Sequence, residues 1–283
     1  MRKLILPILF CCCINLTNAQ YLETGMMAGV SNYLGELKEN YMDVSEYNMA
    51  FGVFMRYRFT PSLAVKASFY KGQLSGNDIN SSQPEIRARN LSFRSDLLEF
   101  GVTGEWHIGG YEILAGKISA PYVFAGLSVF HFNPQSDYHG NWVDLQPLGT
   151  EGQGDGRYGE GNYYNLYQVS IPMGVGVQFS LNHQHNIGLE FGLRKTFTDY
   201  LDDVGGYYPD VDGLMKSNPM AGILSYRSVD TFDGIRPVEN PMGQLRGNPN
   251  NKDWYFMAGV TWSINLTDKK GLEWDPEYRK IYE

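Results

Sequence analysis

The sequence predicts an all-β fold, an eight-stranded antiparallel β-barrel that spans a membrane. Three observations predict it. Apolar residues alternate with period two over about eight segments, the opposing face carries Gly, Ser, Thr and charged residues, and the connections alternate between short and long. A transmembrane barrel turns the apolar face of each strand to lipid and encloses the polar face.

The first nineteen residues form a predicted secretory signal peptide. Arg2 and Lys3 give a positive n-region, residues 4–14 are apolar, and a small-residue cleavage site ends at Ala19. All three cysteines, at positions 11–13, lie inside this segment. The expected mature chain therefore has no disulfide, thiolate metal site or thiol chemistry. Lipidation of one of these cysteines is a less favoured alternative, because the small residue expected before a lipidated cysteine is missing.

The charge of the chain excludes one class of partner. The formal net charge is −8, and loss of two basic residues with the signal peptide leaves −8 − 2 = −10. With no basic patch visible, we expect no nucleic acid partner. Mean hydropathy is −0.33, and no apolar run approaches the length of a transmembrane helix.

The alternating segments follow in order along the chain. In the second segment, for example, Phe51, Val53 and Met55 share one face while Gly52 and Arg56 share the other. Most segments are close to the length that a tilted strand needs to cross a membrane. The eight predicted strands are residues 21–35, 51–59, 63–72, 98–109, 122–132, 169–181, 186–197 and 253–266.

The connections favour a membrane barrel, of the size of OmpA or OmpX, over a soluble one. Short turns lie near Pro61 and His183, with a somewhat longer turn at residues 109–119. Tight periplasmic turns and long external loops are typical of outer-membrane barrels, and an even strand count puts both termini in the periplasm. A lipocalin-like barrel would instead have an apolar interior and a polar outside. The predicted long loops are residues 32–46, 75–90, 133–165 and 199–252.

Several stretches resemble a known family. "APYVFAGLSVFHFNP" (120–134), "YQVSIPMGVGVQFSL" (167–181), "IGLEFGLRKTFTDYLDDVGGYY" (187–208) and "GVSNYLGEL" (29–37) are similar to PorG-type outer-membrane proteins of the type IX secretion machinery in Bacteroidetes. The block "TDYLDDV" is the most specific piece. The long loop after Asp199 and the charged C-terminal tail depart from the family.

The resemblance implies a small barrel in the cell outer membrane that takes part in protein secretion and, in gliding species, in motility-linked export. Its expected partners are outer-membrane lipid and a periplasmic ring protein or lipoprotein. The expected organisation is a signal peptide at 1–19, a barrel at 20–266 and a periplasmic tail at 267–283. A generic small barrel for adhesion or envelope stability is the alternative, and an outer-membrane hydrolase is a third hypothesis.

The sequence offers no evident catalytic set. None of the five histidines has the spacing of a triad or a zinc site, and His183 and His185 lie in a predicted turn. The Gly-rich stretch at 152–161 lacks the Lys-Ser/Thr of a phosphate loop. We therefore expect no enzyme activity, no cofactor and no metal.

The inward phase of the strands carries four acids and four bases. Because an eight-stranded barrel is just wide enough for side chains to fill it, we expect these charges to pair in an interior network without a continuous pore. Solvation is the alternative for Glu23 and Arg58, which lie near strand ends. The predicted network is Glu23, Arg56, Arg58, Lys66, Glu99, Glu105, Glu190 and Arg194.

Two further groups are candidate sites. Asp199, Asp202 and Asp203 should gather at the base of the longest loop, where they accept hydrogen bonds that fix it; calcium binding is the alternative. In the tail, the anchors Trp274, Tyr278 and Tyr282 are the predicted docking residues for a periplasmic partner. A tail that lies on lipid headgroups or stays disordered is the alternative.

Two smaller predictions concern the barrel ends and the lipid face. The turn residues Tyr111, Ile113 and Leu114 are a second candidate docking surface. Outward aromatic residues near strand ends should form two girdles at the membrane interfaces, because their rings are apolar and their polar groups stay wet. These aromatic residues are Tyr57, Trp106, Phe179, Trp254 and Trp262.

Overall fold

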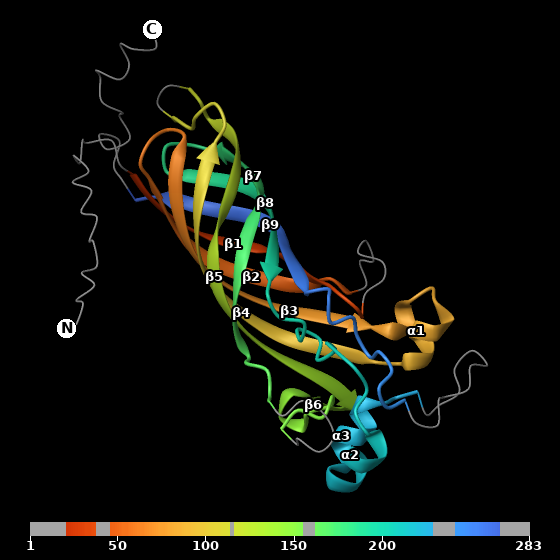
Figure 1. Cartoon of the computed structure of the whole chain (residues 1–283). Coiled ribbons are helices and arrows are strands. Elements are labelled where there is room, and N and C mark those ends of the chain that lie inside the picture. Colours follow the sequence, from red (N-terminus) through yellow and green to blue (C-terminus); the bar gives the residue numbers. More distant parts are fainter. Residues whose placement is uncertain (1–20, 38–45, 114–115, 155–161, 229–240, 267–283) are drawn as a thin grey trace, which may run out of the picture.

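The computed structural model describes residues 21–37, 46–113, 116–154, 162–228 and 241–266. Within these residues eight antiparallel strands close into a barrel, and the short strand β6 forms a hairpin with the end of β5 (Figure 1). The predicted signal peptide and the tail at 267–283 lie outside the described residues. The strands are β1 (Tyr21–Leu34), β2 (Asn48–Arg58), β3 (Leu63–Asn77), β4 (Ser92–His107), β5 (Ser119–Tyr138), β6 (Asn141–Asp144), β7 (Tyr167–Ser180), β8 (His185–Thr196) and β9 (Trp254–Asn265).

The strand pairing confirms the predicted eight-stranded barrel. Each barrel strand pairs with its neighbours in the chain, and the first strand, β1, pairs with the last, β9. Short turns at residues 59–62, 108–118 and 181–184 lie at one end of the barrel, here called the turn end. The longer connections at 35–47, 78–91, 139–166 and 197–253 lie at the other end, the loop end.

Three strands exceed the length that the sequence pattern predicts by at least four residues. β3, β4 and β5 contain 15, 16 and 20 residues, and the extra residues extend the barrel at the loop end. On β5 the outward residues change from apolar Val123, Leu127 and Val129 to polar Asn133 and Gln135. Because a membrane-facing strand is recognised by its apolar alternation, this polar extension carries no signal of its own.

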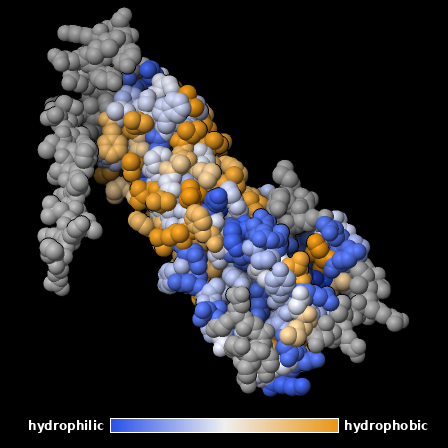
Figure 2. Space-filling model, viewed as in Figure 1, coloured by the Kyte–Doolittle hydropathy of each residue, from blue (hydrophilic) through white to orange (hydrophobic). Residues whose placement is uncertain are grey.

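The outer surface of the barrel is apolar. Large hydrophobic side chains such as Val53, Phe100, Leu127 and Val175 are exposed on it. On the face seen in Figure 2, orange and pale residues cover much of the barrel, and blue residues are concentrated toward the loop end. An apolar surface of this extent is unfavourable in water and fits the hydrocarbon of a membrane. The predicted inward and outward phases of the strands are therefore confirmed.

In the described parts of the loops, three short α-helices lie at the loop end, with α2 and α3 side by side (Figure 1). Asp210 caps α2 by accepting a hydrogen bond from Gly213, and Asn218 caps α3 in the same way, followed by Pro219 at a position that suits proline. Among the described residues, no helix is long and apolar enough to cross a membrane. The helices are α1 (Pro84–Arg89), α2 (Val211–Ser217) and α3 (Pro219–Ser225).

Candidate functional site

The interior of the barrel holds all eight charged residues that the sequence places there. Each is at least nine-tenths buried, including Glu23 and Arg58, for which solvation was the alternative. Their backbones lie on five different strands, so only closure of the barrel brings them together. The strand origins are β1 for Glu23, β2 for Arg56 and Arg58, β3 for Lys66, β4 for Glu99 and Glu105, and β8 for Glu190 and Arg194.

Six of these residues form a continuous chain of opposite charges. Arg58 lies 3.6 Å from Glu23, and Glu23 lies 2.6 Å from Arg56. Arg56 is 2.7 Å from Glu105, which is 3.5 Å from Lys66. The last member is Glu190, whose Oε2 lies 2.5 Å from the Lys66 ammonium. Three acids and three bases therefore compensate one another without solvent, as buried charges require.

The other two charges form a separate pair nearer the loop end. Arg194 Nε lies 3.3 Å from Glu99 Oε2, and the Tyr255 hydroxyl donates a 2.5 Å hydrogen bond to the same carboxylate. Gln178 and Tyr122 complete the larger network by hydrogen bonds to Glu23 and Glu190. Because Gln178 and Tyr122 are uncharged, the pattern of interior charges did not identify them. Their positions in the strand alternation nevertheless point them into the barrel, beside the ion pairs.

The turn end of the barrel is closed by the turn between β4 and β5. Tyr111 is fully buried, its hydroxyl donates to Asn186 at 2.7 Å, and its ring lies under the Arg58 guanidinium at 4.8 Å. The prediction that Tyr111 and Ile113 present a docking surface is therefore wrong, because both side chains point into the protein. Leu114 lies outside the described residues.

An apolar layer fills the loop end of the barrel, above the ionic network. The alternation in the sequence predicts a polar interior, so this layer is a difference between expectation and structure. It is built by inward aromatic and aliphatic residues that continue the strand alternation toward the loop end, and it includes the loop residues Leu201 and Val204. Its largest members are Tyr33, Tyr70, Phe93, Phe130, Phe132 and Tyr255, with Leu74 and Leu97 between them.

One small cavity lies inside the barrel. A cavity of ≈ 10 Å³ lies between the two charged groups, lined in part by Lys66, Glu99, Glu190 and Arg194. That volume holds about one water molecule. With the apolar layer on one side of it and Tyr111 on the other, the described residues form a filled barrel.

The loops fold into a packed assembly over the loop end, here called the lid. Arg246, from the connection between β8 and β9, is buried and lies 3.0 Å from Glu151 in the β5–β7 connection. The same Glu151 oxygen accepts hydrogen bonds from the backbone of Gly205 and Gly206. Arg89 hydrogen-bonds to the Arg246 carbonyl at 2.6 Å, so the β3–β4 connection is joined to the others.

The three predicted acids at the loop base are all buried, but they do not form one site. Asp203 accepts hydrogen bonds from the hydroxyls of Thr150 and Tyr164. Asp202 accepts one from Tyr33 at 2.7 Å and one from its own loop backbone. Asp199 faces a different set of residues. Asp202 and Asp203 thus hold the loop in the way that the structural hypothesis describes.

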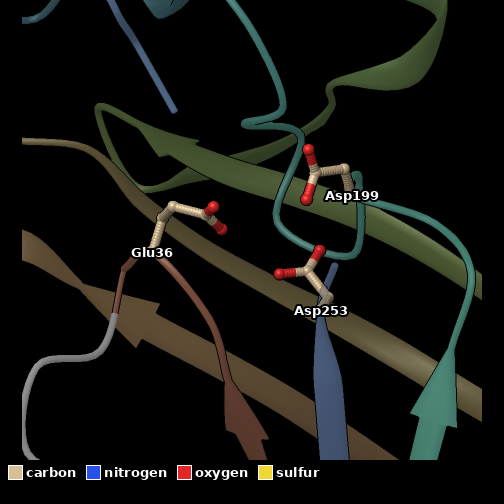
Figure 3. Close-up of side chains that lie close together, drawn as sticks. All are labelled: Glu36, Asp199 and Asp253. Atoms are coloured by element: carbon tan, nitrogen blue, oxygen red, sulfur yellow. The ribbon is translucent and has the colours of Figure 1, made fainter. Parts of the chain in front are cut away.

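A second acidic group forms where three neighbouring strands end. Glu36, Asp199 and Asp253 each direct a carboxylate toward a common space, and one oxygen of each lies within 4.8 Å of the others (Figure 3). Glu36 and Asp253 were not singled out from the sequence, because they lie 163 and 54 residues from Asp199 and no motif joins them. Only the pairing of β9 with both β1 and β8 makes them neighbours.

Burial changes the acidity of these loop carboxyls. It raises the pKa of Asp199 to about 6, with repulsion from Glu36 acting in the same direction and Lys252 opposing it. Burial also raises the pKa of Asp203 to about 6 against the attraction of Arg246. The pKa of Asp253 is held well above its usual range, first by burial and then by the charge of Asp202.

A groove of ≈ 540 Å³ lies at the rim of the lid. Trp142, which is 44% exposed, and Arg94 form part of its wall, with the guanidinium 3.7 Å from the centre of the indole ring. Arg227 also lines the groove and donates to Ser136 at 3.1 Å. Its lining of amide, hydroxyl and charged side chains suits a polar ligand.

A closed antiparallel barrel with an apolar outer face and a filled, charge-paired interior defines a transmembrane β-barrel protein of the outer-membrane type. The chain belongs to the family described as Domain of unknown function (DUF6089), whose model matches residues 2–147. A search of curated proteins found no match.

Solved outer-membrane proteins show a distant likeness. Neisserial surface protein A shares 8% identity and a TM-score of 0.40 over 87% of this chain and 96% of its own. Ail, the attachment invasion locus protein of Yersinia pestis, shares 10% identity and a TM-score of 0.37 over 87% and 97% of the two chains. OprG from Pseudomonas aeruginosa shares 9% identity and a TM-score of 0.35 over 87% and 95%.

Proposed function

We propose that this protein is a non-enzymatic outer-membrane barrel that acts through its two end surfaces. The observation that carries the proposal is the filled interior. Six charged side chains in one network, a second ion pair and an apolar layer occupy the space through which a solute would pass. The barrel is then an anchor, and the turn end and the lid are the parts available for recognition.

The finer proposal is a role in the type IX protein secretion machinery, in contact with a periplasmic ring protein or lipoprotein. Its support is the sequence resemblance, above all the "TDYLDDV" block at 198–204. Asp202 of that block joins the lid to Tyr33 on β1, and Asp203 joins it to Tyr164 in the β5–β7 connection. The proposed docking residues Trp274, Tyr278 and Tyr282 lie outside the described residues.

A pull-down from detergent-solubilised membranes, analysed by mass spectrometry, tests the secretion role. We expect a periplasmic ring component to co-purify, and truncation after Leu266 to abolish that capture and reduce secretion of cargo while the barrel still inserts. Trp274→Ala should reproduce much of the loss. If truncation leaves insertion, capture and secretion normal, the tail does not dock. If no secretion component is captured with the full chain, the secretion role fails.

The proposed orientation places the lid outside the cell and the turn end, with both termini, in the periplasm. It can be tested with single cysteines, since the three native cysteines lie in the predicted signal peptide. Lys216→Cys on α2 and His183→Cys in the β7–β8 turn both replace exposed side chains. An impermeant maleimide on intact cells should label only the first variant. Labelling of His183→Cys alone would show that the protein has the opposite orientation.

The second candidate function is adhesion or envelope stability, and the rim groove favours it. An exposed tryptophan beside amide and charged side chains gives that groove the composition of a polar recognition surface. A deletion strain separates the candidates. Normal secretion with altered surface attachment or detergent sensitivity supports the second function, whereas lost secretion supports the first.

A further inference from the structure

The group formed by Glu36, Asp199 and Asp253 has a position fixed by the barrel itself. Leu34 on β1 stands opposite Trp254 on β9, and Trp254 stands opposite Lys195 on β8. Glu36 follows the end of β1, Asp199 follows the end of β8, and Asp253 immediately precedes β9. The Asp253 N–H also donates to the Thr198 carbonyl at 3.1 Å, which holds the last two segments together.

Asp199 is the least satisfied member of the group. Its side chain is only 3% exposed, yet no donor among the described residues makes a hydrogen bond to either carboxylate oxygen. Its nearest cation is the ammonium of Lys252 at 3.4 Å, on a side chain that is 45% exposed. Glu36 Oε2 is likewise buried without a donor in the described part of the chain. Buried carboxylate oxygens normally have partners, so these oxygens indicate a missing one.

The charges around the group do not balance. Asp202 lies beside it, because the Tyr33 hydroxyl contacts Asp202 at 2.7 Å and Asp253 at 2.8 Å. A phenol has one proton to donate, so one of these two carboxyls must itself carry a proton to make both contacts. Four carboxyl groups thus lie near one cation, Lys252, since Arg89 is paired with Asp78, and crowding of this kind is relieved either by protons or by a bound cation.

We propose that Glu36, Asp199 and Asp253 bind a calcium ion. Calcium takes oxygen ligands at about 2.3–2.6 Å, so two ligands on opposite sides of one ion lie up to about 5.2 Å apart. The three carboxylate oxygens lie within 4.8 Å of one another. Magnesium dehydrates reluctantly and is usually held by one or two carboxylates and several waters, so a group of three carboxylates favours calcium. All three ligands are oxygens, and the group contains no His or Cys of the kind that zinc prefers.

The bound ion has a clear structural role. It joins the segment after β1 to both ends of the long β8–β9 connection, and Asn248 already contacts Glu36 there through its backbone N–H at 3.3 Å. It also neutralises carboxylates that would otherwise repel one another under the lid. Calcium therefore stabilises the lid more than the barrel below it.

Calorimetric titration of the full-length protein in detergent micelles, first stripped with a chelator, tests the site. Calcium chloride should bind with one-to-one stoichiometry, and magnesium chloride at least tenfold more weakly. Asp199→Asn and Glu36→Gln, which keep the side-chain shape, should each weaken calcium binding at least tenfold. Asp212→Asn removes an exposed acid on α2 and should bind like the wild type.

Lys252 distinguishes a calcium site from an ordinary ion pair. If calcium takes the place of the ammonium, Lys252→Gln should bind calcium several-fold more tightly than the wild type. The absence of saturable binding to the wild type, or unchanged binding by Asp199→Asn, would overturn the proposal. Circular dichroism of each variant confirms that the barrel is folded, and a misfolded Asp199→Asn is replaced by Glu36→Gln as the deciding variant.

Discussion

The guanidinium of Arg246 lies 3.0 Å from the carboxylate of Glu151, and both side chains are buried. The two residues are separated by 95 positions in the chain and belong to different loops. Arg246 also donates to the Ser225 carbonyl at the end of α3 at 3.2 Å. The Arg246 side chain thus connects three parts of the lid, which are its own segment, the end of α3 and the loop that contains Glu151.

Replacement of Arg246 by Met should loosen the lid and leave the barrel folded. It removes one partner of a buried ion pair, which costs about 3–5 kcal/mol. Limited proteolysis in micelles should cut the loops of the variant many times faster than those of the wild type. Lys216→Met, an exposed change on α2, is the matched control. Equal proteolysis of Arg246→Met and wild type would show that the lid does not depend on this contact.

In the barrel interior, Lys66→Met should destabilise the fold by about 3–5 kcal/mol, because Glu190 and Glu105 lose their shared cation. Urea unfolding from lipid vesicles measures the loss. The double variant Lys66→Met/Glu190→Gln, which also removes a negative charge, should regain part of it. A double variant less stable than Lys66→Met would contradict this account of the network.

On the lipid face, Val175→Arg should reduce the stability of the folded barrel in vesicles by about 2–4 kcal/mol, since the side chain points outward near the middle of β7. Tyr163→Arg, at an exposed position in the lid, is the control and should have little effect. Unaffected insertion of Val175→Arg would mean that this part of β7 does not face hydrocarbon.

Purified protein in planar bilayers should show no stable single-channel conductance. The ionic network, the cavity of ≈ 10 Å³ and the apolar layer leave no water-filled path through the described barrel. A variant that trims the layer, Phe130→Ala, serves as a comparison. Reproducible long-lived conductance of the wild type would disprove the filled barrel.

Lid stability should depend on pH through Asp199. Its pKa in the folded protein is about 6, above the ordinary value of 3.8. Burial raises this pKa most, and repulsion from Glu36 and Glu151 raises it further, whereas the positive charge of Lys252 lowers it. Asp253 also faces it across the acidic group. The folded state therefore binds the proton more tightly, and the resulting stabilisation is complete below about pH 4 and lost as the pH rises through about 6.

In chelator, resistance of the lid to proteolysis or heat should thus be lower at pH 7.5 than at pH 5, by on the order of 1–3 kcal/mol. Asp199→Asn should remove part of this dependence, because the amide does not titrate, and Asp203, whose pKa is also raised to about 6, should account for a further part. Stability that increases between pH 5 and 7.5 in chelator would contradict the sign.

The barrel was predictable because its signal is local. The alternation of apolar and polar residues along one strand, as from Phe51 to Arg58, separates lipid-facing side chains from interior ones. The partner strand need not be known. The same alternation predicted that the side chains of Arg56 and Glu105 both point into the barrel. It did not reveal that Arg58 contacts Glu23 and Tyr111, since those contacts depend on the register of strands and on a turn that folds inward.

The lid and the acidic group could not be predicted in the same way. Residues such as Glu151 and Arg246 lie in stretches with no periodicity, and they meet only because the loops cover one end of a closed barrel. Asp199 stood out because of its neighbours in sequence, Asp202 and Asp203. Its neighbours in space are Glu36 and Asp253, which arrive from other strands.

The pairing of β1 with β9 has a consequence for biosynthesis. Glu23 stands opposite Asn265, and Leu34 stands opposite Trp254. The first strand to be translated therefore cannot complete its pairing until the last strand has been made. Until then an unfinished chain has two open strand edges, each a template for wrong pairing. Contacts between such distant segments also form slowly. Closure of the barrel therefore requires the complete chain, and a nonsense codon before residue 254 removes β9 and with it the pairing that closes the barrel.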